Sequence, residues 1–239
     1  MPFFERDDIR IHYETYGQGH PLVVFAPGGM RSAIDFWERA PFDPRREFAD
    51  DFRIIALDQR NAGSSTAPIT AQDGWHSYTA DHVALLDHLQ VERCHVLGGC
   101  IGGSFSLGLM QAAPERVSAA VLQQPIGLGG GNRPVFHGLF DDWAANLRPT
   151  HPEVSDATWA TFRDAMYGGD FVFNVSRDFV RDCEIPMLVL MGNDIYHPQE
   201  TSRDIVALAP HATLVEHWKE SENVPTTIER VRAFLRAHR

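Results

Sequence analysis

The sequence predicts an α/β fold, with a mostly parallel, twisted sheet flanked by helices and a helical lid inserted after the sixth strand. Short apolar segments alternate with longer segments whose apolar residues recur at helical spacing, which is typical of parallel strands covered on both faces. The chain has 239 residues and is 44% hydrophobic. It is therefore long enough to form one sizeable core, and a single domain with one insertion is expected.

The expected elements follow in order along the chain. An alternating strand is closed by Gly17-Gln18-Gly19, and later apolar strands end at Pro27-Gly28-Gly29 and at Asp58. The expected strands are 9–16, 22–25, 53–57, 94–98, 117–122, 187–191 and 213–215. The expected helices are 78–89, 104–113 and 225–239, in which apolar residues recur every three or four positions.

One long stretch, from Ile126 to Cys183, interrupts the alternation. It is rich in aromatic residues and contains no obvious strand. At roughly sixty residues it is too long for a single crossover connection, which favours a lid over the ends of the strands. The alternative is a pair of ordinary crossover helices packed on the sheet. We expect a core formed by 1–126 and 183–239, and a cap formed by 127–182.

Composition excludes several classes of protein. The formal net charge is −11, with acidic residues spread along the chain, so neither nucleic acid nor an anionic membrane is an expected partner. The N-terminal residues lack the features of a signal peptide, and no apolar run approaches the ~20 residues of a membrane span. Three cysteines form a sparse, odd set that favours free thiols and a cytoplasmic location.

The histidines do not predict a metal site. Although the chain has 12 of them, no motif has the spacing of metal ligands. We therefore expect neither a metal nor another cofactor. The expected partner is a small-molecule substrate, and association into a homo-oligomer stays open.

The segment Val96 to Gly103 is the most informative one. It predicts a strand, a turn pinched by glycines and the start of a helix, with Cys100 at the centre of a G-x-C-x-G pattern. Backbone N–H groups and the helix dipole at such a turn lower the pKa of a thiol and stabilise an oxyanion. The alternative is an inert, buried cysteine in a glycine-rich turn.

Three segments together resemble the α/β-hydrolase superfamily. The first is the turn at Cys100, where serine is usual, and the second is the loop Asp58 to Ser65, which is similar to the family's D-x-R-G-x-G-x-S loop. The third is Ala26-Pro27-Gly28-Gly29-Met30, at the place of the oxyanion loop. The resemblance implies the α/β-hydrolase fold, with oxyanion donors on Ile101 and on Gly29 or Met30. The loop at Asp58 has a structural role in the family.

The family order of nucleophile, acid and histidine assigns the other catalytic residues. Asp194 follows the strand 187–191 and is the expected acid, while His217 follows the last strand and is the expected base. This Cys-Asp-His set resembles that of the dienelactone hydrolases. His197 is a nearby residue that lines the site at most, and His95 is expected in the core. Met30, Trp143 and Trp218 are expected to bind the substrate.

The resemblance implies a hydrolase that cleaves a small, largely apolar activated ester, lactone or thioester through an acyl-cysteine intermediate. Thiolate is a good leaving group, so a cysteine nucleophile gains most with activated acyl donors. Acyl transfer or cyclisation, carbon–carbon lyase chemistry and ligand binding without catalysis stay open. So does the introduction of Cys100 in place of a serine.

Overall fold

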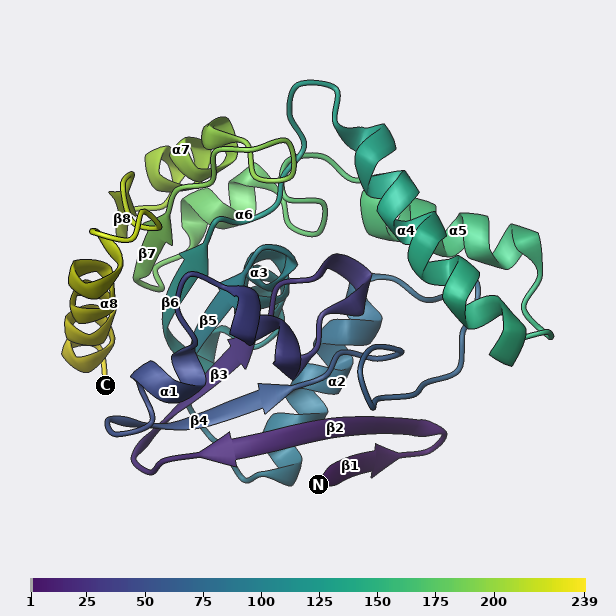
Figure 1. Ribbon diagram of the computed structural model, residues 1–239, viewed down its shortest axis with the longest axis horizontal. Coiled ribbons are helices and arrows are strands. Elements are labelled where there is room, and N and C mark those ends of the chain that lie inside the picture. The colour runs from purple at the N-terminus through teal and green to yellow at the C-terminus, as the bar shows by residue number, and fades with distance from the viewer. Residues whose placement is uncertain (1) are drawn as a thin grey trace.

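The computed structural model describes residues 2–239, so that Met1, the first residue of the predicted core segment 1–126, lies outside the described residues. The strands are β1 (Phe3–Arg6), β2 (Ile9–Tyr16), β3 (His20–Phe25), β4 (Phe52–Leu57), β5 (Cys94–Gly99), β6 (Val117–Gln123), β7 (Met187–Leu190) and β8 (Ala212–Val215). They form one sheet in the order β1-β2-β4-β3-β5-β6-β7-β8 (Figure 1). β1 and β2 pair antiparallel with their neighbours, and the pairs from β4 to β8 are parallel.

Helices lie between the strands, as expected for an α/β chain. They are α1 (Pro44–Glu47), α2 (Trp75–His88), α3 (Ile101–Ala112), α4 (Arg133–Leu147), α5 (Asp156–Tyr167), α6 (Arg177–Asp182), α7 (Gln199–Leu208) and α8 (Val224–Ala237). Four short 3-10 turns join them: η1 (Gly29–Arg31), η2 (Ile34–Arg39), η3 (Pro114–Arg116) and η4 (Arg148–Thr150).

The sheet separates two hydrophobic clusters, because alternate residues of a strand point to opposite faces. On β3, Val23 and Phe25 join the cluster that contains residues of α2, α3 and α7. Leu22 and Val24 join the other cluster, which contains residues of η2 and α8. Both faces of the central strands are therefore covered, which explains continuous apolar runs such as Leu22–Phe25 and Met187–Leu190.

Parallel pairing places the carboxyl ends of β3, β5, β6 and β7 along one edge of the sheet. The loops that follow these strands begin at Ala26, Cys100, Gln124 and Met191. Ligands of open α/β sheets bind in the crevice at this edge. Segments that are far apart in the sequence meet here, and they provide the groups of the candidate site.

The described residues between β6 and β7 form helices, as the sequence predicts for this stretch. α4 and α5 pack side by side, away from the sheet (Figure 1). Rings from both helices form an aromatic cluster, in which Phe140 contacts Trp143, Trp159 and Phe162. Helix α4 also packs against η1, at the carboxyl edge of the sheet. α6 packs instead against α7.

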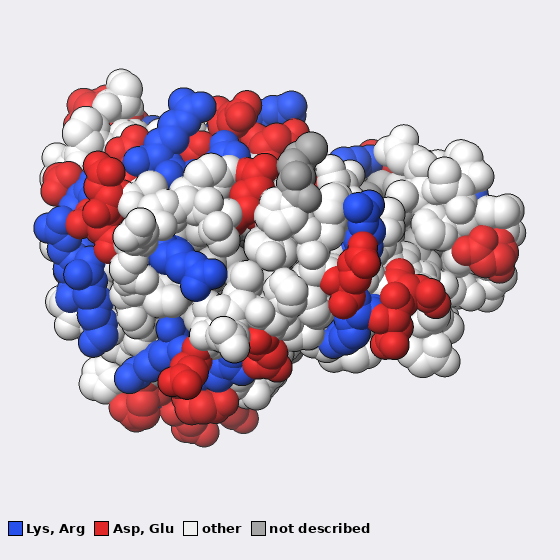
Figure 2. All heavy atoms as spheres, turned by 90° about the horizontal axis from the view of Figure 1, so that it is seen from below, with Lys and Arg blue, Asp and Glu red and all other residues white. Residues whose placement is uncertain are grey.

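The surface carries charges of both signs. On the face in Figure 2, Lys and Arg side chains lie interspersed with Asp and Glu side chains. This mixture agrees with a chain whose formal net charge is −11. Over residues 2–239, no helix has the length and apolar character needed to cross a membrane.

Candidate active site

Cys100 lies on a strained turn between β5 and α3. It has a φ of 58° and is the N-cap residue of α3. A left-handed φ is unfavourable for a residue with a side chain, and such strain is often found at functional sites. The surrounding structure holds it, since the Cys100 N–H donates to Gln123 O at 2.9 Å and the Cys100 carbonyl accepts from Gly103 N at 3.0 Å.

The glycines of the turn are required by close packing. A Cβ on Gly98 would lie 2.0 Å from the carbonyl oxygen of Gly102, and a Cβ on Gly102 would lie 2.2 Å from that of Phe25. Both separations are far below van der Waals contact. The pattern around Cys100 therefore follows from the approach of β5, α3 and β3 to one another.

His197 is the imidazole that faces Cys100. Its Nδ1–H donates to Oδ2 of Asp194 at 2.9 Å, so the buried Nε2 is the ring nitrogen left to face the Cys100 thiol. Both His197 and Cys100 line the same cavity. Asp194 is fixed in turn, because its Oδ1 accepts the backbone N–H groups of Tyr196 and His197.

Cys100 and His197 each shift the pKa of the other. Burial of the thiol disfavours the thiolate, but the charge of His197 and a hydrogen bond from it outweigh burial and lower the pKa of Cys100. Burial likewise disfavours the imidazolium, yet Cys100 and Asp194 raise the pKa of His197. Burial also raises the pKa of Asp194, but His197 and two backbone N–H groups outweigh it and lower that pKa. The arrangement therefore favours a thiolate–imidazolium pair.

His217, the base expected from the sequence, does not lie in this arrangement. It is exposed and is not one of the residues that line the cavity. It comes only two residues after β8, at the edge of the sheet. By the usual spacing of strands, β8 lies about 14 Å from β5. The histidine that lies beside Cys100 is therefore His197, and not His217 as predicted.

Trp218, the neighbour of His217, is packed in the core. Trp218 is fully buried in the cluster on the α8 face of the sheet, and its Nε1–H donates to Met191 O at 2.8 Å. The adjacent His217 is exposed to solvent. Trp218, expected to bind the substrate, lies instead in this cluster and does not line the cavity.

Two backbone N–H groups lie beside the thiol. Those of Gly28 and Ile101 hydrogen bond to the Cys100 sulfur and help to lower its pKa. The expected donors were Ile101 and Gly29 or Met30. Gly29 and Met30 line the cavity, while Gly28, which has a φ of 122°, brings its N–H to the sulfur. The glycine loop after β3 therefore approaches Cys100, with Gly28 as the residue beside the sulfur.

The cavity at Cys100 has a volume of about 180 Å³ and is lined mostly by apolar side chains. The core contributes Met30, Ile101 and Ile126, and helices α4 and α5 contribute Phe136, Leu139 and Tyr167. Gly28, Gly29, Arg31, Cys100, Tyr196 and His197 complete the lining. Such a volume is smaller than that of pockets for drug-sized ligands, which occupy roughly 300–1,000 Å³.

Comparison with known proteins identifies the family. The model of the alpha/beta hydrolase fold family matches residues 21–184, which is more than half of the chain. The chain belongs to the α/β hydrolase fold family.

The aligned regions cover different shares of the individual relatives of this α/β hydrolase-fold protein. A putative carbamate hydrolase RutD from Variovorax paradoxus is 32% identical over 47% of this chain and 41% of the relative, so the chain spans less than half of that protein. A 2-hydroxymuconate semialdehyde hydrolase from Pseudomonas is 26% identical over 91% of this chain and 76% of the relative. The solved structure of Est816, described as an N-acyl homoserine lactone degrading enzyme, superposes with a TM-score of 0.68 at 24% identity, covering 98% of this chain and 100% of that one.

Trp143, another expected substrate-binding residue of this hydrolase-fold chain, belongs to the aromatic cluster of α4 and α5. It is 2% exposed and is not a lining residue of the cavity. Its Nε1–H donates to Asn61 O at 3.0 Å. Asn61 has a left-handed φ of 57°, and its side chain accepts from Ala67 N. Trp143 therefore connects α4 to the loop that follows β4.

That loop is organised by Asp58, in line with the structural role expected for it. The buried Asp58 carboxylate accepts from Ile34 N and Ser64 N, each at 2.8 Å, and from His12 Nδ1 at 2.9 Å. A Cβ on Gly63 would lie 2.3 Å from this carboxylate. The Asp58 loop thus has a structural role, and none of its residues lines the cavity at Cys100.

The other two cysteines of this hydrolase-fold protein are unsuited to nucleophilic chemistry. Cys94 and Cys183 are free and buried. Burial raises the pKa of Cys94 to about 12, and it raises the pKa of Cys183 as well. Among the three thiols, Cys100 is the one whose pKa is lowered. In the described part of the chain, no group of His, Cys, Asp and Glu side chains has the arrangement of a metal site.

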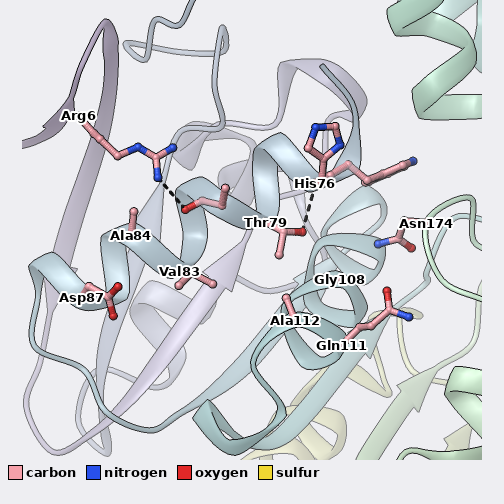
Figure 3. Close-up of a pocket in the computed structure, with 12 residues that line it drawn as sticks. Arg6, His76, Thr79, Val83, Ala84, Asp87, Gly108, Gln111, Ala112 and Asn174 are labelled. Atoms are coloured by element: carbon pink, nitrogen blue, oxygen red, sulfur yellow. Dashed lines mark hydrogen bonds between the residues drawn. The ribbon is translucent and has the colours of Figure 1, made fainter. Parts of the chain in front are cut away.

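A larger groove of about 560 Å³ lies between α2 and α3 (Figure 3). Small and apolar side chains such as Val83, Ala84 and Ala112 form its floor, and Arg6 and Asp87 lie at its rim. Cys100, Asp194 and His197 are not among its lining residues. Size alone therefore does not identify the active site, since the smaller cavity is the one that Cys100 and His197 line.

Proposed function

We propose that this protein is a thiol hydrolase in which Cys100 is the nucleophile, His197 the base and Asp194 the residue that orients the base. The observation that carries the proposal is the continuous series of contacts from Asp194 through His197 to Cys100 at the end of an apolar cavity. A nucleophile, a base and an orienting carboxylate within reach of one another are the parts that acyl transfer requires.

The reaction begins with the thiolate. Nε2 of His197 takes the proton of the thiol, and the sulfur attacks the acyl carbon, so that a C–S bond forms and the carbonyl oxygen becomes an oxyanion. The N–H of Ile101 and an N–H of the Gly28-Gly29 segment hold this oxyanion. Removal of one such donor costs roughly 3–4 kcal/mol in the transition state.

Two proton transfers complete the cycle. The imidazolium of His197 gives its proton to the leaving oxygen or sulfur as the bond to the acyl carbon breaks, which leaves a thioester on Cys100. His197 then takes a proton from water, the hydroxide attacks the thioester, and the Cys100 thiolate leaves with the acid as product. Asp194 keeps the tautomer in which Nε2 faces Cys100.

The cavity supports a small, largely apolar substrate with an activated acyl group, such as an ester, lactone or thioester. Its lining is mostly apolar and its volume is about 180 Å³. Relatives and neighbours are named for carbamate, semialdehyde and lactone substrates, all of which are small carbonyl compounds. A cysteine nucleophile adds a preference for good leaving groups, since the tetrahedral intermediate otherwise expels thiolate.

We further propose that residues 127–182 act as a cap. Phe136, Leu139 and Tyr167 from this segment line the cavity that the core leaves open above Cys100. They would exclude water from the acyl-enzyme until a substrate-derived alcohol or thiol has left. A nucleophilic thiolate also needs a reducing compartment, which is consistent with a cytoplasmic location.

Intact mass spectrometry tests the proposed function. The protein is mixed with phenyl acetate, an enol-lactone and S-phenyl thioacetate, then quenched in acid within seconds. We expect an acyl adduct that peptide mapping places on Cys100, and no adduct in Cys100→Ala. Turnover that persists in Cys100→Ala would overturn the proposal, and Cys94→Ala serves as the matched thiol control.

A second candidate is hydrolysis of a dienol or semialdehyde in which Cys100 and His197 transfer protons without forming an acyl-enzyme. The similarity to the 2-hydroxymuconate semialdehyde hydrolase over 91% of this chain favours it. Turnover of such a compound without an adduct on Cys100, lost in His197→Gln, would support this candidate over the thiol mechanism.

A further inference from the structure

Tyr167 is held rigidly at the end of α5. Its ring stacks on Phe136 with centroids 5.3 Å apart and meets the edges of Phe173 at 5.3 Å and of Trp75 at 6.4 Å. The backbone carbonyl of Tyr167 accepts from Arg133, and that of Met166 accepts from Trp75 Nε1 at 2.6 Å. Packing on several sides therefore fixes where the phenol points.

The hydroxyl of Tyr167 has no role within the protein. Only 1% of the residue is accessible, yet it lines the cavity that contains Cys100. Across residues 2–239, neither a side chain nor a backbone group forms a hydrogen bond with this hydroxyl. Unlike the hydroxyl of Tyr78, which is fully buried and also has no partner, the Tyr167 hydroxyl is not completely enclosed by protein. An O–H group that opens only into the cavity is available to a bound substrate.

Cys100 lies close enough to influence this phenol. Burial raises the pKa of Tyr167 well above its ordinary value, and the charge of the Cys100 thiolate raises it further. The hydroxyl therefore keeps its proton at neutral and moderately alkaline pH. A phenol that stays protonated is a hydrogen-bond donor to oxygen, and a polar donor in an apolar cavity selects what it contacts.

Cysteine chemistry creates a need for such a donor. In the tetrahedral intermediate, the thiolate of Cys100 and the oxygen of the leaving group compete to depart. An ester hydrolase with a cysteine must therefore favour cleavage of the C–O bond. The N–H groups of Gly28 and Ile101, which lie beside the Cys100 sulfur, are the donors proposed for the carbonyl oxygen. Tyr167, in contrast, lies on helix α5, outside these loops.

We propose that the Tyr167 hydroxyl donates a hydrogen bond to the leaving-group oxygen of an oxygen ester or lactone, and so selects for oxygen leaving groups. As the C–O bond breaks, the electron pair moves to that oxygen and the proton comes from Nε2 of His197. Tyr167 keeps its own proton, so it is regenerated without a further step. This inference rests on the proposed function.

A matched pair of substrates tests the inference. Phenyl acetate and S-phenyl thioacetate deliver the same acetyl group, but sulfur is a weak hydrogen-bond acceptor. In Tyr167→Phe, the acylation rate for phenyl acetate is expected to fall about tenfold, while that for S-phenyl thioacetate falls less than about twofold. The phenylalanine ring preserves the aromatic packing, so a general loss of structure would lower both rates together.

Tyr196→Phe is the control, since Tyr196 also lines the cavity but is partly exposed. We expect the ratio of the two acylation rates to keep its wild-type value in this variant. Equal losses for both substrates in Tyr167→Phe, or a selective loss in Tyr196→Phe alone, would overturn the inference. If Tyr167→Phe forms the Cys100 adduct with the thioester at the wild-type rate, the proposed function stands whatever the ratio. If the wild-type protein forms no adduct with either compound, both proposals fail.

Discussion

Asp194 and His197 lie three residues apart on one loop, and Oδ2 of Asp194 accepts a hydrogen bond from Nδ1 of His197 at 2.9 Å. The loop follows β7, so that a single connection supplies both the proposed base and the residue that orients it. Gly192 makes this loop compact, because a Cβ on it would lie 2.4 Å from the Cβ of His197. The geometry of the base therefore depends on one short segment.

Alkylation of Cys100 should depend on pH in a way that His197 controls. The thiolate is the reactive form, and the pKa of Cys100 is lowered, so reaction with iodoacetamide should persist below the pH at which ordinary thiols stop reacting. Reactivity is lost as the pH falls through this lowered pKa. In His197→Gln the midpoint should move up by about one pH unit or more, because the favourable charge is gone.

Peptide mapping after a short exposure to iodoacetamide measures this dependence for each thiol. Cys94 and Cys183 are buried and have raised pKa values, so they should stay unlabelled in the folded protein. An identical pH midpoint in the wild type and in His197→Gln would show that His197 does not influence the thiol.

Arg60 should be important for stability. Its guanidinium is buried and pairs with Asp73 at 2.6 Å and with Asp81 at 2.8 Å. Arg60→Met removes the buried cation that the two carboxylates share, and leaves Asp81 with the half-exposed Arg6 and Asp73 with Thr70 alone. We therefore expect a loss of about 3 kcal/mol or more in the free energy of unfolding. Arg181→Met is the control, because Arg181 forms an exposed pair with Asp178 and should change stability by less than about 0.5 kcal/mol. Urea denaturation measures both, and similar values for the two variants would contradict this account.

Gly98→Ala should disrupt the turn at Cys100. The added methyl group would lie 2.0 Å from a backbone oxygen of α3, which cannot move without displacing the nucleophile. We expect a loss of about 3 kcal/mol in the free energy of unfolding, together with loss of activity. Gly138 offers a matched control within α4, because its Cβ would meet nothing within 4 Å.

Gly138→Ala should instead stabilise the protein by about 0.5–1 kcal/mol, since alanine favours an exposed helical position. Thermal denaturation and an ester assay on the two variants check both expectations. A Gly98→Ala protein with wild-type stability would contradict the packing around the turn.

The sequence was sufficient to predict the sheet and the position of Cys100. Strong local signals explain this, because runs such as Leu22–Phe25 are apolar at every position and glycines mark the turns. The first strand, β1, and the helices α1 and α7 were missing from the expected elements. β1 is a short antiparallel edge strand of 4 residues, and its pairing with β2 rather than its own sequence defines it.

The direction of single side chains was not predictable in the same way. His217 and Trp218 were both expected at the site, but the large indole is buried in the α8 cluster and the histidine is exposed to solvent. The same applies to Trp143, which packs among aromatic rings and donates to Asn61 O. Loop length did not separate the two histidines, because the loops after β7 and β8, residues 191–198 and 216–223, are equally long. The signal for His197 was its position three residues after Asp194, which lets one loop hold both side chains.

The most direct test of the account compares two histidine variants in one assay. The value of kcat/KM for phenyl acetate is measured for the wild type, His197→Gln and His217→Gln under identical conditions. We predict a loss of about a thousandfold or more in His197→Gln, because general-base assistance contributes roughly 10²–10⁴-fold, and a change within about twofold in His217→Gln. The opposite result, with activity lost in His217→Gln and retained in His197→Gln, would contradict the assignment of His197 as the base.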